Sequence, residues 1–284
     1  MLEEDDKMEP FQENQNNQLS KPPKTNSWVQ VLFTGFILYI VSLVFLILTG
    51  NPNLFPTVVI IGSFLVPISY VTFFYEHRHF SSLSLSTTLI SFVYGGLLGV
   101  LAASLLEPIF VRSLNPANTI VIGLVEEFAK ILGVLVIAHH RQHDKEMDGL
   151  ILGAAVGMGF AAFESTGYAF TAFITSGGSL SQTVSVTLLR AILSPLGHGT
   201  WTAILASVLF RESKAGRFRL NIKVISVYFL VSILHGLWDG LPTVINAFLG
   251  SGMDVFLGQV FVGGAGFIIL WLRWREARML RQPE

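Results

Sequence analysis

Two glutamates and a lysine, Glu126, Glu127 and Lys130, lie within one helical turn in the middle of an apolar run. An ionisable side chain at the bilayer centre costs about 2.5 to 3.5 kcal/mol on insertion scales, so such residues are functional candidates by default. In a helix the lysine reaches both glutamates, and we expect it to neutralise one carboxylate and leave the other free as a general base. Adjacent helix positions point about 100° apart, so the sequence does not assign the base to one of the two.

Two imidazoles and a third glutamate also lie inside apolar runs. His198, His235 and Glu164 make a two-histidine, one-carboxylate set that suits a zinc ion with a fourth position open for water. Asp239 follows His235 by one helical turn, and we expect it to orient that imidazole through a hydrogen bond. The chemistry that this set indicates is hydrolysis by an activated water molecule.

Each of these features also has a purely structural explanation. A glutamate beside Lys130 can be a buried ion pair that fixes helix packing, and His235 with Asp239 can be a hydrogen bond between helices. The histidine-rich stretch at residues 139–143 is better explained as a solvated loop. The agreement of four segments, rather than any one of them, favours a shared site.

Composition indicates that the scaffold lies in a membrane. Of 284 residues, 13% are charged and 51% are apolar, which excludes a water-soluble globule. The net charge is −1 without a long basic run, so no nucleic-acid partner is expected, and the absence of cysteine excludes thiolate chemistry and Cys-ligated metal. Runs of about 20 apolar residues predict an all-α, polytopic bundle of about eight transmembrane helices. They lie near residues 28–49, 54–75, 86–106, 119–138, 149–174, 184–210, 222–243 and 254–272.

The chain divides into three parts. Residues 1–27 predict a disordered acidic tail, residues 28–272 the transmembrane domain with its motif-bearing core at 119–243, and residues 273–284 a short basic tail. Of the 18 basic residues, the two tails and alternate loops on one side hold all except Arg112, Lys130 and Arg190. This bias predicts that both termini are cytoplasmic, which requires an even number of spans.

Three sequence features should shape the site, namely the depth of the ionisable residues, a proline before His198 and a glycine repeat. With a rise of about 1.5 Å per residue, the ionisable residues of the fourth to seventh predicted spans fall at similar depths. These depths lie between the extracytoplasmic half and the middle of the bilayer. Pro195, three residues before His198, predicts a kink that admits water or substrate. Gly149, Gly153 and Gly157 recur every four residues and predict close helix packing.

Four motifs, in order and on separate spans, resemble those of the PrsW family of intramembrane proteases. They are Glu126-Glu127-Phe128-Ala129-Lys130, Phe160 through Glu164, His198, and His235 through Asp239. The resemblance covers residues 119 to about 243. That family is related to the type II CAAX prenyl endopeptidases and bacteriocin-processing proteases.

The resemblance implies a multi-pass protease of the bacterial cell membrane. Its substrate would be a membrane-anchored protein, for example an anti-sigma factor, cut near its extracytoplasmic side. Glu126 and Glu127 would be catalytic, with His198, His235 and Glu164 in the metal or transition-state-stabilising set. The prenyl endopeptidase relatives have histidine in place of Glu164, so a glutamate-activated water with histidines as the oxyanion hole is the alternative to a metal.

Two other classes of function fit the same residues. Embedded carboxylates and histidines on Gly/Pro-broken helices also occur in proton-coupled transporters and ion pathways. Transporters often have two similar halves, whereas the first three spans here lack counterparts of the motifs. A non-catalytic scaffold or immunity-type protein would instead bind partners through its acidic tail or basic loop.

Overall fold

The computed structural model describes residues 26–78, 81–113, 115–139, 145–214, 217–249 and 254–279. Within these ranges every regular element is a helix, and the single β contact is an isolated bridge between Lys214 and Arg217. The all-α prediction is therefore confirmed. The predicted acidic tail lies outside the described residues, except for Asn26 and Ser27, where the first helix begins.

The described helices form the spans that the apolar runs predict. They are α1 (Ser27–Thr49), α2 (Leu54–Glu76), a continuous run of α3 (Leu85–Ile90), η1 (Ser91–Gly95) and α4 (Gly96–Phe110), α5 (Asn118–Ala138), α6 (Glu146–Thr175), a broken run of α7 (Leu180–Leu193), η2 (Ser194–Leu196) and α8 (His198–Arg211), α9 (Ile222–Leu249) and α10 (Asp254–Met279). Among the described residues, 7 spans are long and apolar enough to cross a membrane. The eighth, α5, is 21 residues long and falls outside this set because it carries three charged residues, Glu126, Glu127 and Lys130.

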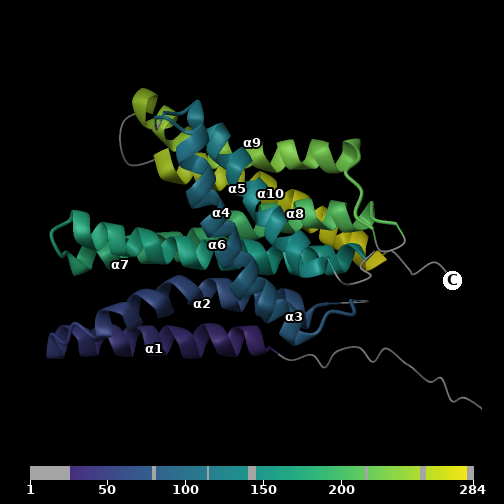
Figure 1. Ribbon diagram of the computed structural model, residues 1–284. Coiled ribbons are helices and arrows are strands. Elements are labelled where there is room, and N and C mark those ends of the chain that lie inside the picture. The colour runs from purple at the N-terminus through teal and green to yellow at the C-terminus, as the bar shows by residue number, and fades with distance from the viewer. Residues whose placement is uncertain are drawn as a thin grey trace, which may run out of the picture.

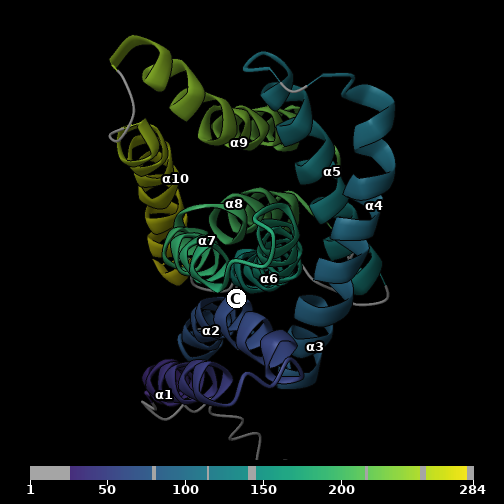
Figure 2. The same ribbon diagram turned by 90° about the vertical axis from the view of Figure 1, so that its left-hand side faces the viewer.

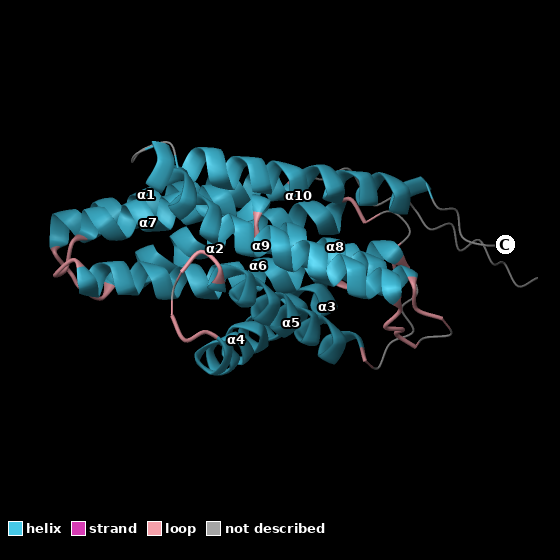
Figure 3. Ribbon diagram, turned by 90° about the horizontal axis from the view of Figure 1, so that it is seen from above, coloured by secondary structure: helices cyan, strands magenta, loops and turns pink. Residues whose placement is uncertain are grey.

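The central spans are α6 and the broken run of α7 and α8 (Figure 1). In the view along the bundle, α9 lies above this centre, α10 to its left, α1 and α2 below it, and α4 and α5 to its right (Figure 2). From above, the described chain is made of helices joined by loops (Figure 3). The centre of the bundle is thus in contact with spans from both halves of the sequence.

The predicted glycine face joins α6 to α8. A Cβ atom placed at Gly149, Gly153 or Gly157 would collide with a backbone carbonyl oxygen of α8, and at Gly157 that oxygen belongs to His198. Small residues let helix backbones approach closely in lipid, where packing rather than the hydrophobic effect holds helices together. The prediction of close packing is confirmed, and the contact at Gly157 sets the depth of His198 against α6.

The predicted interruption at Pro195 is also confirmed. The α7 helix ends at Leu193, a single 3-10 turn contains Pro195, and Gly197 has φ −108° and ψ −123°, outside the helical region. A new helix, α8, then begins at His198. Proline cannot donate a backbone hydrogen bond, so the chain breaks here rather than continuing as one long helix.

The two ends of the described chain lie at the same end of the bundle, as an even number of spans requires (Figure 1). The α10 helix runs to Met279, seven residues past the predicted end of the last span at 272, so Arg273, Arg275 and Arg278 lie on its last turns. Arg273 is largely buried there and pairs with Glu146 at the start of α6, 2.5 Å away.

Candidate intramembrane active site

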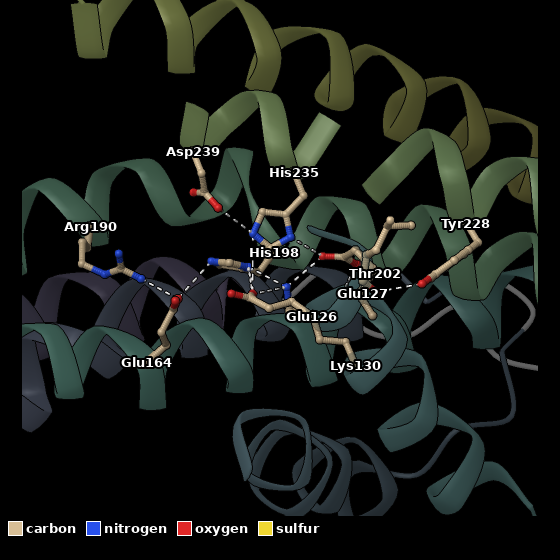
Figure 4. Close-up of polar contacts among 11 residues, drawn as sticks. Glu126, Glu127, Lys130, Glu164, Arg190, His198, Thr202, Tyr228, His235 and Asp239 are labelled. Atoms are coloured by element: carbon tan, nitrogen blue, oxygen red, sulfur yellow. Dashed lines mark hydrogen bonds and ion pairs between the residues drawn. The ribbon is translucent and has the colours of Figure 1, made fainter. Parts of the chain in front are cut away.

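Ionisable side chains from four successive spans meet inside the bundle (Figure 4). The spans are α5, α6, the broken run of α7 and α8, and α9. The residues are Glu126, Glu127, Lys130, Glu164, Arg190, His198, His235 and Asp239. The sequence predicted a common depth for these side chains, and the structure joins them through a continuous chain of contacts.

Lys130 lies at the centre of this group and is fully buried. Its Nζ is 2.8 Å from Glu127 Oε1, 3.0 Å from Glu126 Oε2 and 2.8 Å from His198 Nδ1. The expectation that the lysine neutralises one glutamate and frees the other does not match this geometry. One helical turn brings positions i+3 and i+4 to the same face, so one ammonium group contacts both carboxylates.

The ring of His235 is oriented by Glu127 rather than by Asp239. Nδ1 is 3.1 Å from Glu127 Oε1, and because a carboxylate can only accept, the imidazole donates there. In the neutral imidazole Nε2 then carries the lone pair, and it lies 3.5 Å from Glu126 Oε2 and 3.5 Å from Asp239 Oδ2. Asp239 thus approaches Nε2, whereas the hydrogen bond that orients the ring runs from Nδ1 to Glu127.

The ring of His198 is oriented in the same way by Glu164. Nε2 is 3.1 Å from Glu164 Oε2 and donates to it, which leaves the lone pair on Nδ1. Nδ1 is 3.7 Å from Glu126 Oε2. In each histidine, one ring nitrogen donates to a carboxylate, Glu127 for His235 and Glu164 for His198. The other ring nitrogen faces Glu126.

Glu164 is itself held by Arg190. The guanidinium donates from Nη2 to Glu164 Oε2 at 2.5 Å and from Nε to Ser165 Oγ at 3.0 Å, and it lies over the ring of Tyr168, 4.1 Å from the ring centre. Arg190 belongs to α7 and His198 to α8, so the break at Pro195 lets the same span approach Glu164 from two sides. The sequence identified Arg190 as an embedded charge but assigned it no partner.

A cavity of about 750 Å³ opens onto one side of the cluster. Its wall includes Glu126, Glu164, Arg190, His198 and Asp239, whereas Glu127, Lys130 and His235 lie behind it. The lining also reaches Asn115 and Pro116, in the loop between α4 and α5. The two adjacent glutamates, which the sequence could not tell apart, therefore differ in access to the cavity.

Glu126, His198 and His235 form the group among the described residues that could hold a metal ion. One ligand atom from each lies within 4.8 Å of the others. Glu126 Oε2 is buried and accepts no hydrogen bond of good geometry, which suits a further ligand. Oxygen and imidazole nitrogen are donors that zinc takes, so the residue types fit, with Glu126 in the position that the sequence assigned to Glu164.

Two residues of α8 at the site were missed in the sequence. The indole of Trp201 lies 4.7 Å from the His235 ring and 5.6 Å from the His198 ring, and Thr202 donates to Glu127 Oε2 at 3.3 Å. Both follow His198 by three or four residues. That spacing places them on the same helix face, which is the signal that could have identified them.

Fold and site together define the class of protein: a multi-pass membrane protein with a carboxylate–histidine site and a cavity inside the helical bundle, the layout of an intramembrane hydrolase. A sequence model described as PrsW family intramembrane metalloprotease matches residues 84–270. The chain belongs to this family, and it is therefore a protease whose substrate is a membrane protein.

Two curated relatives carry the name Protease PrsW. That of Halalkalibacterium halodurans is 29% identical over 180 residues, which cover 61% of this chain and 78% of the relative. That of Geobacillus kaustophilus is 24% identical over 228 residues, which cover 76% of this chain and 88% of the relative. No solved structure gives a significant match.

Proposed function

We propose that the protein is an endopeptidase that cuts a membrane-anchored protein, for example an anti-sigma factor, near its extracytoplasmic side, and that Glu126 activates the water. One observation carries the assignment. Of the two adjacent glutamates, Glu126 lines the cavity, whereas Glu127 lies behind it against Lys130 and His235. A general base must reach the water whose proton it accepts.

In this mechanism Glu126 takes a proton from a water in the cavity as the water oxygen attacks the peptide carbonyl. The same residue then delivers that proton to the leaving amine as the C–N bond breaks. Lys130 offsets the carboxylate charge, and Glu127 and Glu164 hold the two imidazoles with their free nitrogens facing Glu126. Arg190 acts through Glu164 as a positioning residue.

Zinc is the proposed cofactor, held by Glu126, His198 and His235. A bound zinc ion polarises a carbonyl and lowers the pKa of its water to about 7. One oxygen of Glu126 would serve as the ligand, and its other oxygen would remain to accept the proton of the water, with Asp239 on the same cavity wall.

The side of cleavage follows from the cavity and from the predicted orientation. The lining includes Asn115 and Pro116, which precede α5. The distribution of basic residues predicts that the loop between α4 and α5 is extracytoplasmic. A substrate segment that reaches this cavity would thus be cut in the outer half of the bilayer, and the cell membrane of a bacterium is the proposed location.

The test is cleavage in proteoliposomes that contain the purified protein and a panel of single-span membrane proteins, anti-sigma factors among them. Product termini are read by mass spectrometry. Wild-type protein should release a fragment cut near the extracytoplasmic side, and Glu126→Gln should release none while keeping its thermal unfolding midpoint. Full cleavage by Glu126→Gln would remove Glu126 from the mechanism.

A further inference from the structure

The surroundings of the Lys130 ammonium leave no place for another partner. An ammonium group has three N–H donors. Lys130 Nζ makes hydrogen bonds with Glu127 Oε1 at 2.8 Å and with His198 Nδ1 at 2.8 Å, and it forms an ion pair with Glu126 Oε2 at 3.0 Å. The ring of Phe160 covers the remaining side, 4.3 Å from Nζ to the ring centre. The cation is therefore enclosed by two carboxylates, an imidazole nitrogen and an aromatic ring.

The contact with His198 has a further consequence for metal binding. A neutral imidazole has one N–H and one lone pair. The N–H of His198 is on Nε2, which faces Glu164 at 3.1 Å, so the lone pair is on Nδ1 and faces Lys130. That lone pair cannot accept a hydrogen bond and coordinate a metal ion at the same time.

Electrostatic repulsion also opposes the binding of a metal ion next to Lys130. Two of the three atoms around the ammonium, Glu126 Oε2 and His198 Nδ1, come from residues that could hold a metal ion, and they are 3.7 Å apart. A zinc ion within about 2.0 to 2.2 Å of both would lie close to the ammonium group. Two cations at such a separation, away from water, repel each other strongly.

We infer that Lys130 is a built-in cation that competes with the metal ion for His198. This inference rests on the proposed zinc site. Zinc binds His198 when Lys130 withdraws from Nδ1, and Glu127, which is not among the proposed ligands, is the partner that can retain the ammonium. The lysine thus lowers the affinity of the site for metal and offsets part of the carboxylate charge when no metal is bound.

The experiment is a zinc titration of the detergent-purified full chain by calorimetry. Removal of Lys130 alone leaves buried carboxylates without a cation, so the main variant is the double substitution Glu127→Gln and Lys130→Met, which preserves net charge. Glutamine at position 127 can still accept from His235 Nδ1. The control adds His198→Ala to this double variant, and circular dichroism checks that each protein is folded.

The double variant should bind zinc about 10- to 100-fold more tightly than wild type, the range expected for loss of one hydrogen bond to a charged group. Addition of His198→Ala should abolish that gain. Wild-type affinity equal to or above that of the folded double variant would overturn the competition and leave the zinc site intact. Absence of zinc binding in both proteins would overturn the zinc site and the competition with it.

Discussion

The α1 and α6 helices differ in a way that reverses the rule for soluble proteins. In an apolar stretch of 18 residues of α1 the mean hydropathy is 2.8 and 6% of the residues are buried, whereas in α6 the mean hydropathy is 1.4 and 83% of the residues are buried. Lipid tails are as apolar as leucine, so hydrophobicity gives a helix no reason to leave the lipid. Small and polar residues determine which helices form the interior, and the same interior carries the site.

The largest expected effect is on catalysis at the site in the bundle interior. Glu126→Gln should lower the rate of substrate cleavage by about 100- to 10,000-fold, the usual contribution of a general base. Glu127→Gln should lower it less, because a glutamine carbonyl can still accept from His235 Nδ1. Initial rates in proteoliposomes measure both. A greater loss in Glu127→Gln than in Glu126→Gln would reverse the assignment of the two glutamates.

The next effect tests the packing of α6. Gly157→Ala would drive a Cβ into the carbonyl oxygen of His198, whereas nothing lies within 4 Å of a Cβ at Gly167 on the same helix. We expect Gly157→Ala to lower the free energy of unfolding by about 1 to 3 kcal/mol and Gly167→Ala to leave it unchanged or slightly raised. Denaturation in detergent compares the two. Equal stability of both variants would show that the close approach of α6 and α8 is dispensable.

A smaller effect concerns the carboxylate that orients His198. Glu164→Gln should weaken zinc binding about 10-fold, and up to 100-fold, as loss of a carboxylate behind a metal-bound histidine commonly does. Arg190→Lys keeps the positive charge but cannot donate to Glu164 and Ser165 with the planar geometry of a guanidinium. It should therefore weaken zinc binding by a smaller factor. Calorimetric titration measures both. Unchanged affinity in Glu164→Gln would mean that the ring of His198 does not need this partner.

The smallest effect is expected on the outer helix. Leu48 of α1 is 75% exposed, and Leu48→Ala should change the free energy of unfolding by no more than about 0.5 kcal/mol. Leu205 of α8 is 1% exposed, and Leu205→Ala should cost about 2 to 5 kcal/mol. Comparable losses in the two variants would contradict the view that the exposed face of α1 meets lipid alone.

The sequence predicted the spans, and it predicted that the embedded ionisable residues lie together, for physical reasons. A bilayer demands apolar runs of a fixed length and makes each embedded charge costly, so both appear directly in the sequence. The break at Pro195 and the glycine face at Gly149, Gly153 and Gly157 follow from backbone chemistry that is also local. These predictions needed no knowledge of how the helices pack.

The partner of each side chain could not be predicted in the same way. Asp239 follows His235 by one turn, yet Glu127 on another helix faces Nδ1, because the rotation of α5 against α9 decides which carboxylate arrives. Glu164 was expected beside a metal, but Arg190 and His198 hold it from both sides. Spacing along one helix fixes a face, whereas contacts between helices depend on rotations that the sequence does not state.

The helix break before His198 has an electrostatic consequence. Because α8 starts at His198, the positive end of its dipole, equivalent to about half an elementary charge, lies inside the bundle beside the cavity rather than at the membrane surface. An unbroken span would have placed no helix terminus there. The interior end of α8 therefore favours negative charge next to His198, the sign of the charge that develops on a peptide carbonyl oxygen when water adds to it.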